Sequence, residues 1–330
     1  MLLADLNWKP LSDLRNISDP LELVNSVPRL AREESYARTN IEAWQKDFED
    51  DTTSTRKIET FGADFIYKRE SDNANLYGYV VIPSSLKKQL KTTDISPSIP
   101  AIILFHTGAG PQDIFIKYQA DKLVRENLWG KEECIVFIAD IISDGIGWAW
   151  SDRNRYWEAR KRLLEVTEKD GLKKRWLLRE TVHATLEAVK SIDVVDRERI
   201  GAFGYCLGGQ PIFELGMMQS NGLKGLVSFH GLYDNISESD HDELKHKSKR
   251  KVLVCNGSAD PYVPSSDVER AAEVFKKCGW DVDVLNYENV FHNFSNPRKE
   301  YDDPGMGYDE YAATNSWSAA MNLLHDVFEL

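Results

Sequence analysis

A cysteine between glycines is the residue of this chain best suited to nucleophilic chemistry. The apolar run Ile200–Tyr205 leads directly into Cys206, and a helical stretch, Pro211–Met217, follows it. Gly204 and Gly208 flank the cysteine in the pattern G-x-C-x-G-G, which is typical of a nucleophile on a sharp strand-to-helix turn, with cysteine in place of the usual serine. Glycine lets the backbones of such a turn approach closely, and the helix N-terminus favours the reactive thiolate. The alternative is a buried, unreactive cysteine in a glycine-rich turn.

Two partners for such a nucleophile occur downstream, in the order acid and then histidine. Asp260 lies in the loop after the apolar run Lys251–Asn256, and His292 follows the run Asp283–Glu288. Because the carboxyl ends of parallel strands meet at one edge of a sheet, these side chains are expected to meet Cys206 there. The sequence therefore predicts a catalytic triad in which histidine is the base and aspartate orients it. Taken alone, Asp260 has an alternative interpretation as a turn residue before proline, and His292 has one as a surface-loop histidine.

Two backbone N–H groups are predicted to stabilise the oxyanion of this reaction. One belongs to Leu207, the residue after the nucleophile, and the other to Gly108, in the loop that follows Ala101–Phe105. The same loop reads Gly-Ala-Gly, which also begins a dinucleotide-binding pattern, but Asp113 stands where the third glycine belongs. The sequence therefore favours an oxyanion-stabilising loop and predicts no cofactor.

Short apolar runs, which must carry these residues, recur from residue 100 onward. They are expected to be strands and comprise Ala101–Phe105, Cys134–Ala139, Ile200–Tyr205, Gly225–His230, Lys251–Asn256 and Asp283–Glu288. The first five are almost continuously apolar, as is typical of strands that are covered on both faces of a parallel sheet. This pattern predicts helices on both sides of the sheet.

Helical stretches and a hairpin complete the predicted architecture. One expected helix carries the apolar stripe Leu178, Val182, Leu186 and Val189. Two others are expected over Ser266–Cys278 and Ala312–Glu329. Phe61–Arg69 and Leu76–Pro83 are predicted to form a hairpin, and Ser84–Ser98 a polar connector. Together they predict an α/β fold: a doubly wound, mostly parallel sheet with a leading antiparallel hairpin, in three layers.

The chain is expected to divide into two parts. Residues 1–58 are polar and carry one helical stretch around Ala31–Phe48, which predicts a mostly helical N-terminal extension packed on the main domain. Residues 59–330 are predicted to form that main domain, which is a normal length for one α/β domain.

Composition narrows the classes of partner. The 53 acidic residues outnumber the 41 basic ones, for a net charge of -12, which argues against a nucleic-acid partner. The start of the chain has no basic segment followed by an apolar run, so we expect no secretory signal, and no stretch approaches the length of uncharged apolar sequence that a membrane span requires. The four cysteines have no C-x-x-C spacing, and no ligand cluster has metal spacing, so we expect a cytoplasmic protein without a metal. The sequence leaves the oligomeric state open, a homo-oligomer included.

At this point the sequence resembles the dienelactone hydrolase family. The resemblance covers about residues 60–330 and rests on Gly204–Gly209, on Gly257 with Asp260, and on Phe291–Phe294. It implies the α/β-hydrolase fold, as well as hydrolysis of lactones or activated esters through a thioester-type acyl-enzyme, without a cofactor. The resemblance also implies a glutamate that holds the resting cysteine neutral, but this chain has Thr107 at that position. It further implies an arginine that binds the substrate carboxylate, but this chain has Asn296 there.

These two departures predict a substrate other than a carboxylated dienelactone. The loop Ile141–Trp150 has no basic residue and is followed by further aromatic residues, which predicts an aromatic wall for a larger or less charged substrate. Core or helix packing is the alternative for the aromatic residues. The residues predicted to line the pocket are His106, Thr107, Trp148, Trp150 and His230, and the two histidines have hydrogen-bonded core histidines as their alternative.

The sequence therefore predicts an enzyme that cleaves a carboxylic ester or lactone, a small-molecule substrate, through Cys206, His292 and Asp260. The same departures leave a second hypothesis open. In it, the chain is a catalytically silent α/β-hydrolase-fold protein that acts as a small-molecule sensor or an interaction scaffold.

Overall fold

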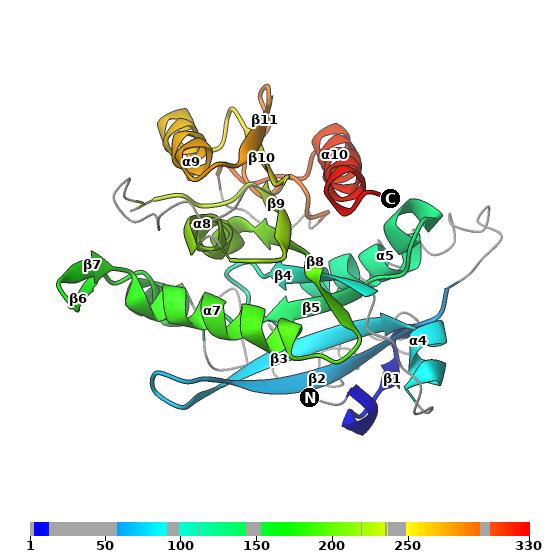
Figure 1. Ribbon diagram of the computed structural model, residues 1–330. Helices are drawn as coiled ribbons and strands as arrows, with labels where there is room; N and C mark the ends of the chain where they lie inside the picture. The colour runs from blue at the N-terminus through cyan, green and yellow to red at the C-terminus, as the bar shows by residue number, and fades with distance from the viewer. Residues whose placement is uncertain are drawn as a thin grey trace.

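A nine-stranded sheet runs through the part of the protein that the structure, a computed structural model, describes (Figure 1). That part comprises residues 3–12, 58–90, 99–111, 113–142, 153–218, 220–234, 236, 249–297 and 304–330. The strands are β1 (Lys9–Pro10), β2 (Thr60–Arg69), β3 (Ala74–Pro83), β4 (Ile99–Phe105), β5 (Ile135–Ala139), β8 (Val195–Tyr205), β9 (Leu223–Phe229), β10 (Lys251–Gly257) and β11 (Asp281–Tyr287). Two further short strands, β6 (Thr167–Lys169) and β7 (Leu172–Lys174), form a separate antiparallel pair.

The order of the strands across the sheet is β1-β2-β3-β5-β4-β8-β9-β10-β11. Pairing is antiparallel from β1 to β5 and parallel from β5 to β11. The predicted fold class is confirmed: a mostly parallel sheet follows a leading antiparallel hairpin. In the parallel part, the carboxyl ends of β4, β8, β9, β10 and β11 lie along one edge of the sheet.

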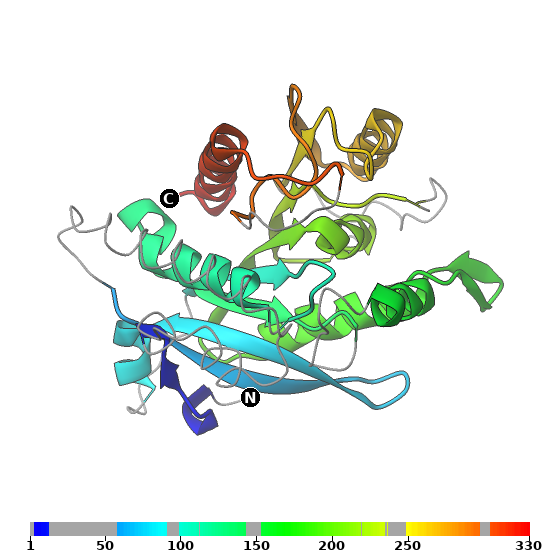
Figure 2. The same cartoon turned by 180° about the vertical axis from the view of Figure 1, so that it is seen from behind.

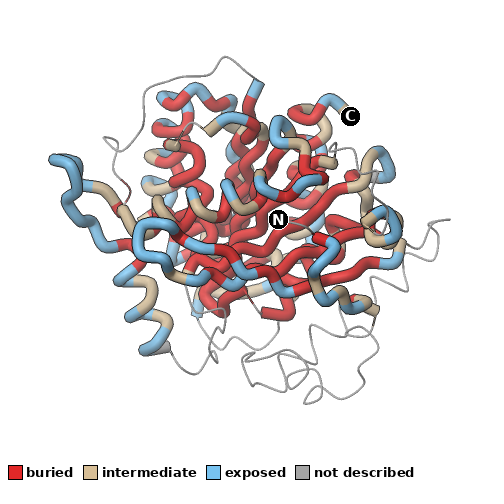
Figure 3. Tube along the Cα trace, turned by 60° about the horizontal axis from the view of Figure 1, so that its bottom comes forward, coloured by how far each residue is buried: buried red, intermediate tan, exposed pale blue. Residues whose placement is uncertain are grey.

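Helices cover both faces of the sheet, as Figures 1 and 2 show from opposite sides. The helices are α4 (Ser84–Gln89), α5 (Ile114–Gly130), α6 (Arg153–Leu163), α7 (Trp176–Lys190), α8 (Gly209–Met218), α9 (Ser265–Lys277) and α10 (Glu310–Phe328). One apolar core contains side chains of α7, α8 and α9, and the other contains side chains of α5 and α10. The protein is therefore three-layered, and buried residues fill its interior (Figure 3).

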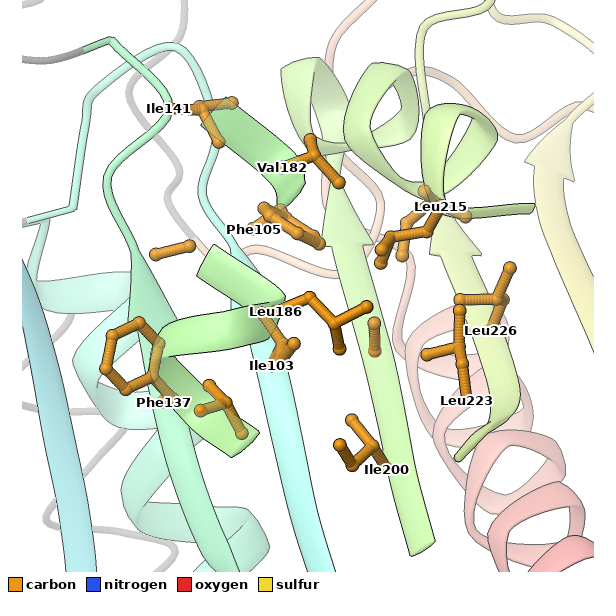
Figure 4. Close-up of a cluster of buried hydrophobic side chains, with 14 of the residues drawn as sticks. Ile103, Phe105, Phe137, Ile141, Val182, Leu186, Ile200, Leu215, Leu223 and Leu226 are labelled. Carbon is orange, nitrogen blue, oxygen red and sulfur yellow. The ribbon is translucent and has the colours of Figure 1, made fainter. Parts of the chain in front are cut away.

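The apolar stripe of α7 shows how the sequence builds one of these layers. Val182 and Leu186 are fully buried and lie over Ile103, Phe105 and Phe137 of the sheet (Figure 4). Full burial of such a side chain stabilises a fold by about 1.5–3 kcal/mol. This packing fixes α7 on the face of the sheet that contains β4 and β5.

The sequence did not predict several of these elements. The segment expected to be a polar connector begins with α4, and α5, α6 and the β6–β7 pair were not foreseen. Helix α5 lacks a visible apolar stripe because it buries Lys117, Asp121 and Arg125 beside its apolar residues. Arg125 Nε lies 2.9 Å from Asp121 Oδ2, so these two charges neutralise each other within the helix.

Residues 3–12 show how the start of the chain meets the sheet. Leu3 and Leu11 are buried, and β1 pairs with Phe61 and Gly62 of β2. The helix expected around residues 31–48 lies outside the described residues, so the division at residue 58 stays a prediction. Among the residues that the structure describes, no helix is long and apolar enough to cross a membrane.

Candidate active site

Cys206 lies on a strained turn between β8 and α8. Its φ angle is 53°, in the left-handed region that a residue with a Cβ rarely adopts. The glycines around it leave no room for a side chain. A Cβ on Gly204 would lie 2.2 Å from the Gly208 carbonyl oxygen, and a Cβ on Gly208 would lie 2.5 Å from the Phe105 carbonyl oxygen. Such strain costs on the order of 1–3 kcal/mol and persists where surrounding structure enforces it. The turn thus presents Cys206 beside the end of β4.

Asp260 and His292 meet because the loops after β10 and β11 are joined. The N–H of Ala259 donates to the Val290 carbonyl at 3.0 Å, and a Cβ on Gly257 would lie 2.1 Å from that same oxygen. His292 Nδ1 lies 2.6 Å from Asp260 Oδ2, and both side chains are buried. The other oxygen of Asp260 accepts from the N–H groups of its own loop, which fixes the carboxylate.

His292 also contacts Cys206. Its side chain forms a hydrogen bond with Cys206, and because Nδ1 faces Asp260, the contact falls to Nε2. Burial disfavours the imidazolium, but the negative charge of Cys206 and the hydrogen bonds with Asp260 and Cys206 raise the pKa of His292 to about 10. The arrangement therefore favours the protonated form of His292 at neutral pH.

His230 packs against His292 from the end of β9. The two ring centroids lie 5.0 Å apart, and His230 Nε2 lies 2.8 Å from the hydroxyl oxygen of Ser295. Burial, followed by the charge of His292, holds the pKa of His230 well below its ordinary value. His230 is therefore a neutral ring behind the charged one, and its role in lining a pocket stays a prediction.

The loop after β4 is pinned by His106 and Thr107. His106 is fully buried, its Nδ1 lies 2.6 Å from the Thr107 carbonyl, and the Ile141 N–H donates to its Nε2 at 3.4 Å. The Thr107 hydroxyl accepts from the Ala109 N–H at 3.2 Å and donates to Asp113 at 3.5 Å. His106 thus has the bonding of a core histidine, the alternative that the sequence left open.

We expect acid to destabilise the protein through His106. Burial lowers the pKa of His106 from 6.5 to about 4, although the bond to Thr107 opposes this. When the pH falls from about 6.5 to 4, the unfolded chain binds a proton at this histidine and the folded chain does not, so stability is lost in that window. At about 1.4 kcal/mol per pKa unit, the loss is on the order of 3 kcal/mol.

Urea unfolding between pH 7 and pH 4 tests this expectation. His106→Gln should be less stable than the wild type at pH 7 and should lose less stability on acidification. His183→Gln, at an exposed position of α7, is the matched control and should follow the wild type. Equal acid sensitivity in wild type and His106→Gln would contradict the assignment.

The two predicted oxyanion donors belong to the segments that directly follow β8 and β4. Leu207 belongs to the short 3-10 helix η3 (Cys206–Gly208), and Gly108 lies in the pinned loop after β4. The ring of Tyr156, on α6, lies against Gly108: a Cβ on this glycine would be 2.8 Å from Cε2 and 3.1 Å from Cζ. The space beside Gly108 is therefore closed on one side by the phenol.

Other predicted residues fall elsewhere. Trp148 and Trp150 lie outside the described residues. Asn296 is buried, and its N–H donates to the Asn293 carbonyl at 3.0 Å. Among the described residues, no group of three or more His, Cys, Asp or Glu side chains could hold a metal ion.

Sequence reasoning missed a polar network beside Cys206. Arg160 of α6 lies 2.5 and 2.6 Å from the two carboxylate oxygens of Asp234, and Gln210 Nε2 donates to the Asp234 carboxylate at 3.1 Å. Gln210 is at the start of α8, four positions after the cysteine. No spacing in the sequence joins these three residues, because they come from separate segments.

Known proteins resemble this chain over most of its length. The model of the dienelactone hydrolase family matches residues 88–328. A dienelactone hydrolase-like promiscuous phosphotriesterase from metagenomic libraries shares 22% identity and superposes with a TM-score of 0.63, covering 81% of this chain and 98% of that chain. A thermostable esterase shares 12% identity with a TM-score of 0.53, covering 81% of this chain and 62% of its own.

A relative among known sequences covers less. An uncharacterized protein of Caenorhabditis elegans is 30% identical over 152 residues, which are 46% of this chain and 94% of the relative. The solved structures support the α/β-hydrolase fold, and the family model spans most of the chain, including the segments of Cys206, Asp260 and His292. The chain therefore belongs to the dienelactone hydrolase family and is, as a member of it, a hydrolase of ester bonds.

Proposed function

We propose that this protein hydrolyses uncharged carboxylic esters or lactones through a Cys206–His292–Asp260 triad. The observation that carries the proposal is the continuous contact from Asp260 Oδ2 to His292 Nδ1, at 2.6 Å, and from His292 to Cys206. A nucleophile, a base and an orienting carboxylate in contact are what acyl transfer requires. Membership in the dienelactone hydrolase family supports the same chemistry.

In the acylation step, the Cys206 thiolate attacks the carbonyl carbon and forms a C–S bond. The carbonyl electron pair moves to oxygen, where the Leu207 and Gly108 N–H groups stabilise the oxyanion. When the oxyanion collapses, the C–O bond of the ester breaks, and His292 gives its proton to the departing alkoxide. A thioester on Cys206 and a neutral His292 remain.

In the deacylation step, neutral His292 takes a proton from water, and the hydroxide attacks the thioester. The C–S bond then breaks, which releases the carboxylic acid and restores the thiolate beside protonated His292. Asp260 holds Nδ1 so that Nε2 faces the reacting atoms in both steps. The charges on Asp260 and Cys206, which raise the pKa of His292, stabilise the resting pair.

The charges near Cys206 favour an uncharged substrate. Arg160 is bound by the Asp234 carboxylate through two contacts, so its charge is neutralised within the protein. Around His292 the neighbours are aromatic: the Tyr262 ring centroid lies 5.2 Å away, and Phe291 is half exposed beside it in the chain. Burial of a carboxylate without a partner is costly, whereas apolar groups pack well against aromatic rings.

A panel of paired substrates tests this specificity. We expect kcat/KM for a neutral aryl or alkyl ester to exceed that of the same ester with a carboxylate on its acyl chain by about tenfold or more, as one unpaired buried charge costs at least 1.4 kcal/mol. A phosphotriester belongs in the panel, because a structural neighbour is named as a phosphotriesterase. A preference for the carboxylated member would overturn the proposed substrate class. No turnover across the panel, with an inert Cys206, would favour the sensor or scaffold hypothesis.

A further inference from the structure

Tyr262 packs against the ring of His292. The two ring centroids lie 5.2 Å apart, and the rings meet edge to face with an angle of 61° between their planes. The His230 ring also contacts His292, at 5.0 Å, but His230 is fully buried, whereas Tyr262 is 40% exposed. Of these two rings, Tyr262 is therefore the one that a molecule arriving from solvent can touch.

The backbone of Tyr262 is fixed to the loops that carry Asp260 and His292. The Tyr262 N–H donates to Asp260 Oδ1 at 2.8 Å. Pro261, between these two residues, packs against the segment beside His292, since a Cβ on Gly305 would lie 2.3 Å from Pro261 Cγ. The Gly305 carbonyl in turn accepts from the His292 N–H at 2.9 Å. A contact group whose backbone is held in this way binds a ligand at a lower ordering cost.

The chemistry of the reaction decides which part of an ester lies beside this ring. In the acylation step, His292 gives its proton to the departing alkoxide, so the ester oxygen must come within hydrogen-bond reach of Nε2, about 3 Å. The alcohol part of the ester is attached to this oxygen, whereas the acyl part stays on Cys206. Because the Tyr262 ring contacts the His292 ring, the alcohol part is the portion of the ester that comes within its reach.

We propose that Tyr262 contacts the alcohol part of the substrate and makes the enzyme selective for esters of aromatic alcohols. Tyrosine presents a large, rigid ring at a low entropy cost, and two aromatic rings in contact gain more than the burial of their area alone. The inference rests on the proposed function, because it takes His292 as the proton donor to the leaving group. It deepens that proposal by naming the part of the ester that is selected.

Two esters of one acid, benzyl butyrate and ethyl butyrate, test the inference. Both leave the same butyryl group on Cys206, so the ratio of their kcat/KM values reports the alcohol part alone. In Tyr262→Ala we expect the benzyl-to-ethyl ratio to fall about tenfold, because the contact between two aromatic rings is lost. The ratio of ethyl butyrate to ethyl acetate, which varies the acyl part, should change by less than about twofold.

Three further variants keep the test decisive. Tyr262→Phe retains the ring and should retain the benzyl-to-ethyl ratio. Tyr262→Leu retains apolar bulk without the ring and should lower this ratio, which provides a reading if Tyr262→Ala is unstable. The matched control is Tyr311→Ala on α10, because Tyr311 is more exposed, at 72%, and its ring packs with Tyr287 at 6.2 Å. This variant should leave both ratios unchanged.

The outcomes separate the inference from the function on which it rests. An unchanged benzyl-to-ethyl ratio in a folded Tyr262→Ala protein would overturn the inference, whether both esters keep their rates or lose them equally, because the ring would then only support His292. A change confined to the acyl ratio would also overturn it, because it would place the ring beside the acyl part. Failure of the proposed function is distinct, since Cys206→Ala would then hydrolyse both esters at the wild-type rate.

Discussion

Replacement of Cys206 with alanine should lower kcat/KM for an activated neutral ester by about a thousandfold or more. The sulfur supplies the electron pair that forms the acyl-enzyme, and alanine offers no substitute. Removal of one member of a triad typically abolishes most of the rate enhancement, because the members act as a unit. The residual rate should come from the oxyanion donors and from binding. Initial rates with a chromogenic ester, corrected for the uncatalysed reaction, give this ratio.

The other cysteines provide the control for this variant. Cys278 lies at the end of α9, where it is buried and far along the chain from the elbow. Cys278→Ala should keep the wild-type rate, and thermal unfolding should show that both variants are folded. A folded Cys206→Ala protein with wild-type activity would exclude cysteine catalysis.

Replacement of Asp260 with asparagine should lower kcat/KM by about a thousandfold to ten-thousandfold. The carboxylate oxygen that faces His292 Nδ1 at 2.6 Å holds this nitrogen as the protonated one. An amide NH2 at the same place would turn Nδ1 into an acceptor, so that Nε2 would carry the proton and could no longer accept one from Cys206 or water. The volume of the side chain hardly changes, and the fold should survive.

The matched control for this variant is Asp267→Asn in the first turn of α9, where Asp267 pairs with Arg270 at the surface. It should leave activity unchanged. A loss of less than about tenfold in Asp260→Asn would mean that the aspartate holds its loop and does not orient the histidine. Steady-state kinetics at several pH values separate this outcome from a simple change in the pH optimum.

Much of the fold was predictable because its signals are local. Most strands of the parallel part are almost continuous apolar runs, and β4, β5 and β10 were found with bounds close to those in the structure. Strand β8 begins at Val195, five residues before the predicted start, because its first residues are polar. The elbow is also a local signal, since the glycines beside Cys206 are demanded by contacts within a few residues and with β4. The order of the downstream aspartate and histidine then followed from the chemistry of acyl transfer.

Besides the short α4, two longer helices, α5 and α6, escaped prediction because their sequences conceal their buried faces. Helix α5 buries charged residues that pair within the protein, so its polar side chains do not mark a solvent face. Helix α6 has six charged residues among eleven, and one of them, Arg160, is held by its contacts with Asp234. A pattern of apolar residues cannot reveal a helix that is fixed by ion pairs.

The polar network of Arg160, Asp234 and Gln210 escaped prediction for a different reason. Arg160, Asp234 and Gln210 come from three separate segments, and only the folded sheet brings them together. His106 was predicted as a pocket residue from its place at a strand end, but whether its ring faces a substrate or the core depends on the loop after β5. That loop donates the Ile141 N–H to the ring.

The central claim is that Cys206 carries the acyl group, and peptide mass spectrometry of the enzyme quenched during turnover tests it most directly. The protein is mixed with an excess of a slowly deacylating aryl ester, quenched in acid within the first turnovers and digested. We predict a mass increase equal to one acyl group on the peptide that contains Cys206, absent from Cys206→Ala and removed by hydroxylamine. An active enzyme that never carries the acyl group on Cys206, or that carries it elsewhere, would contradict the account.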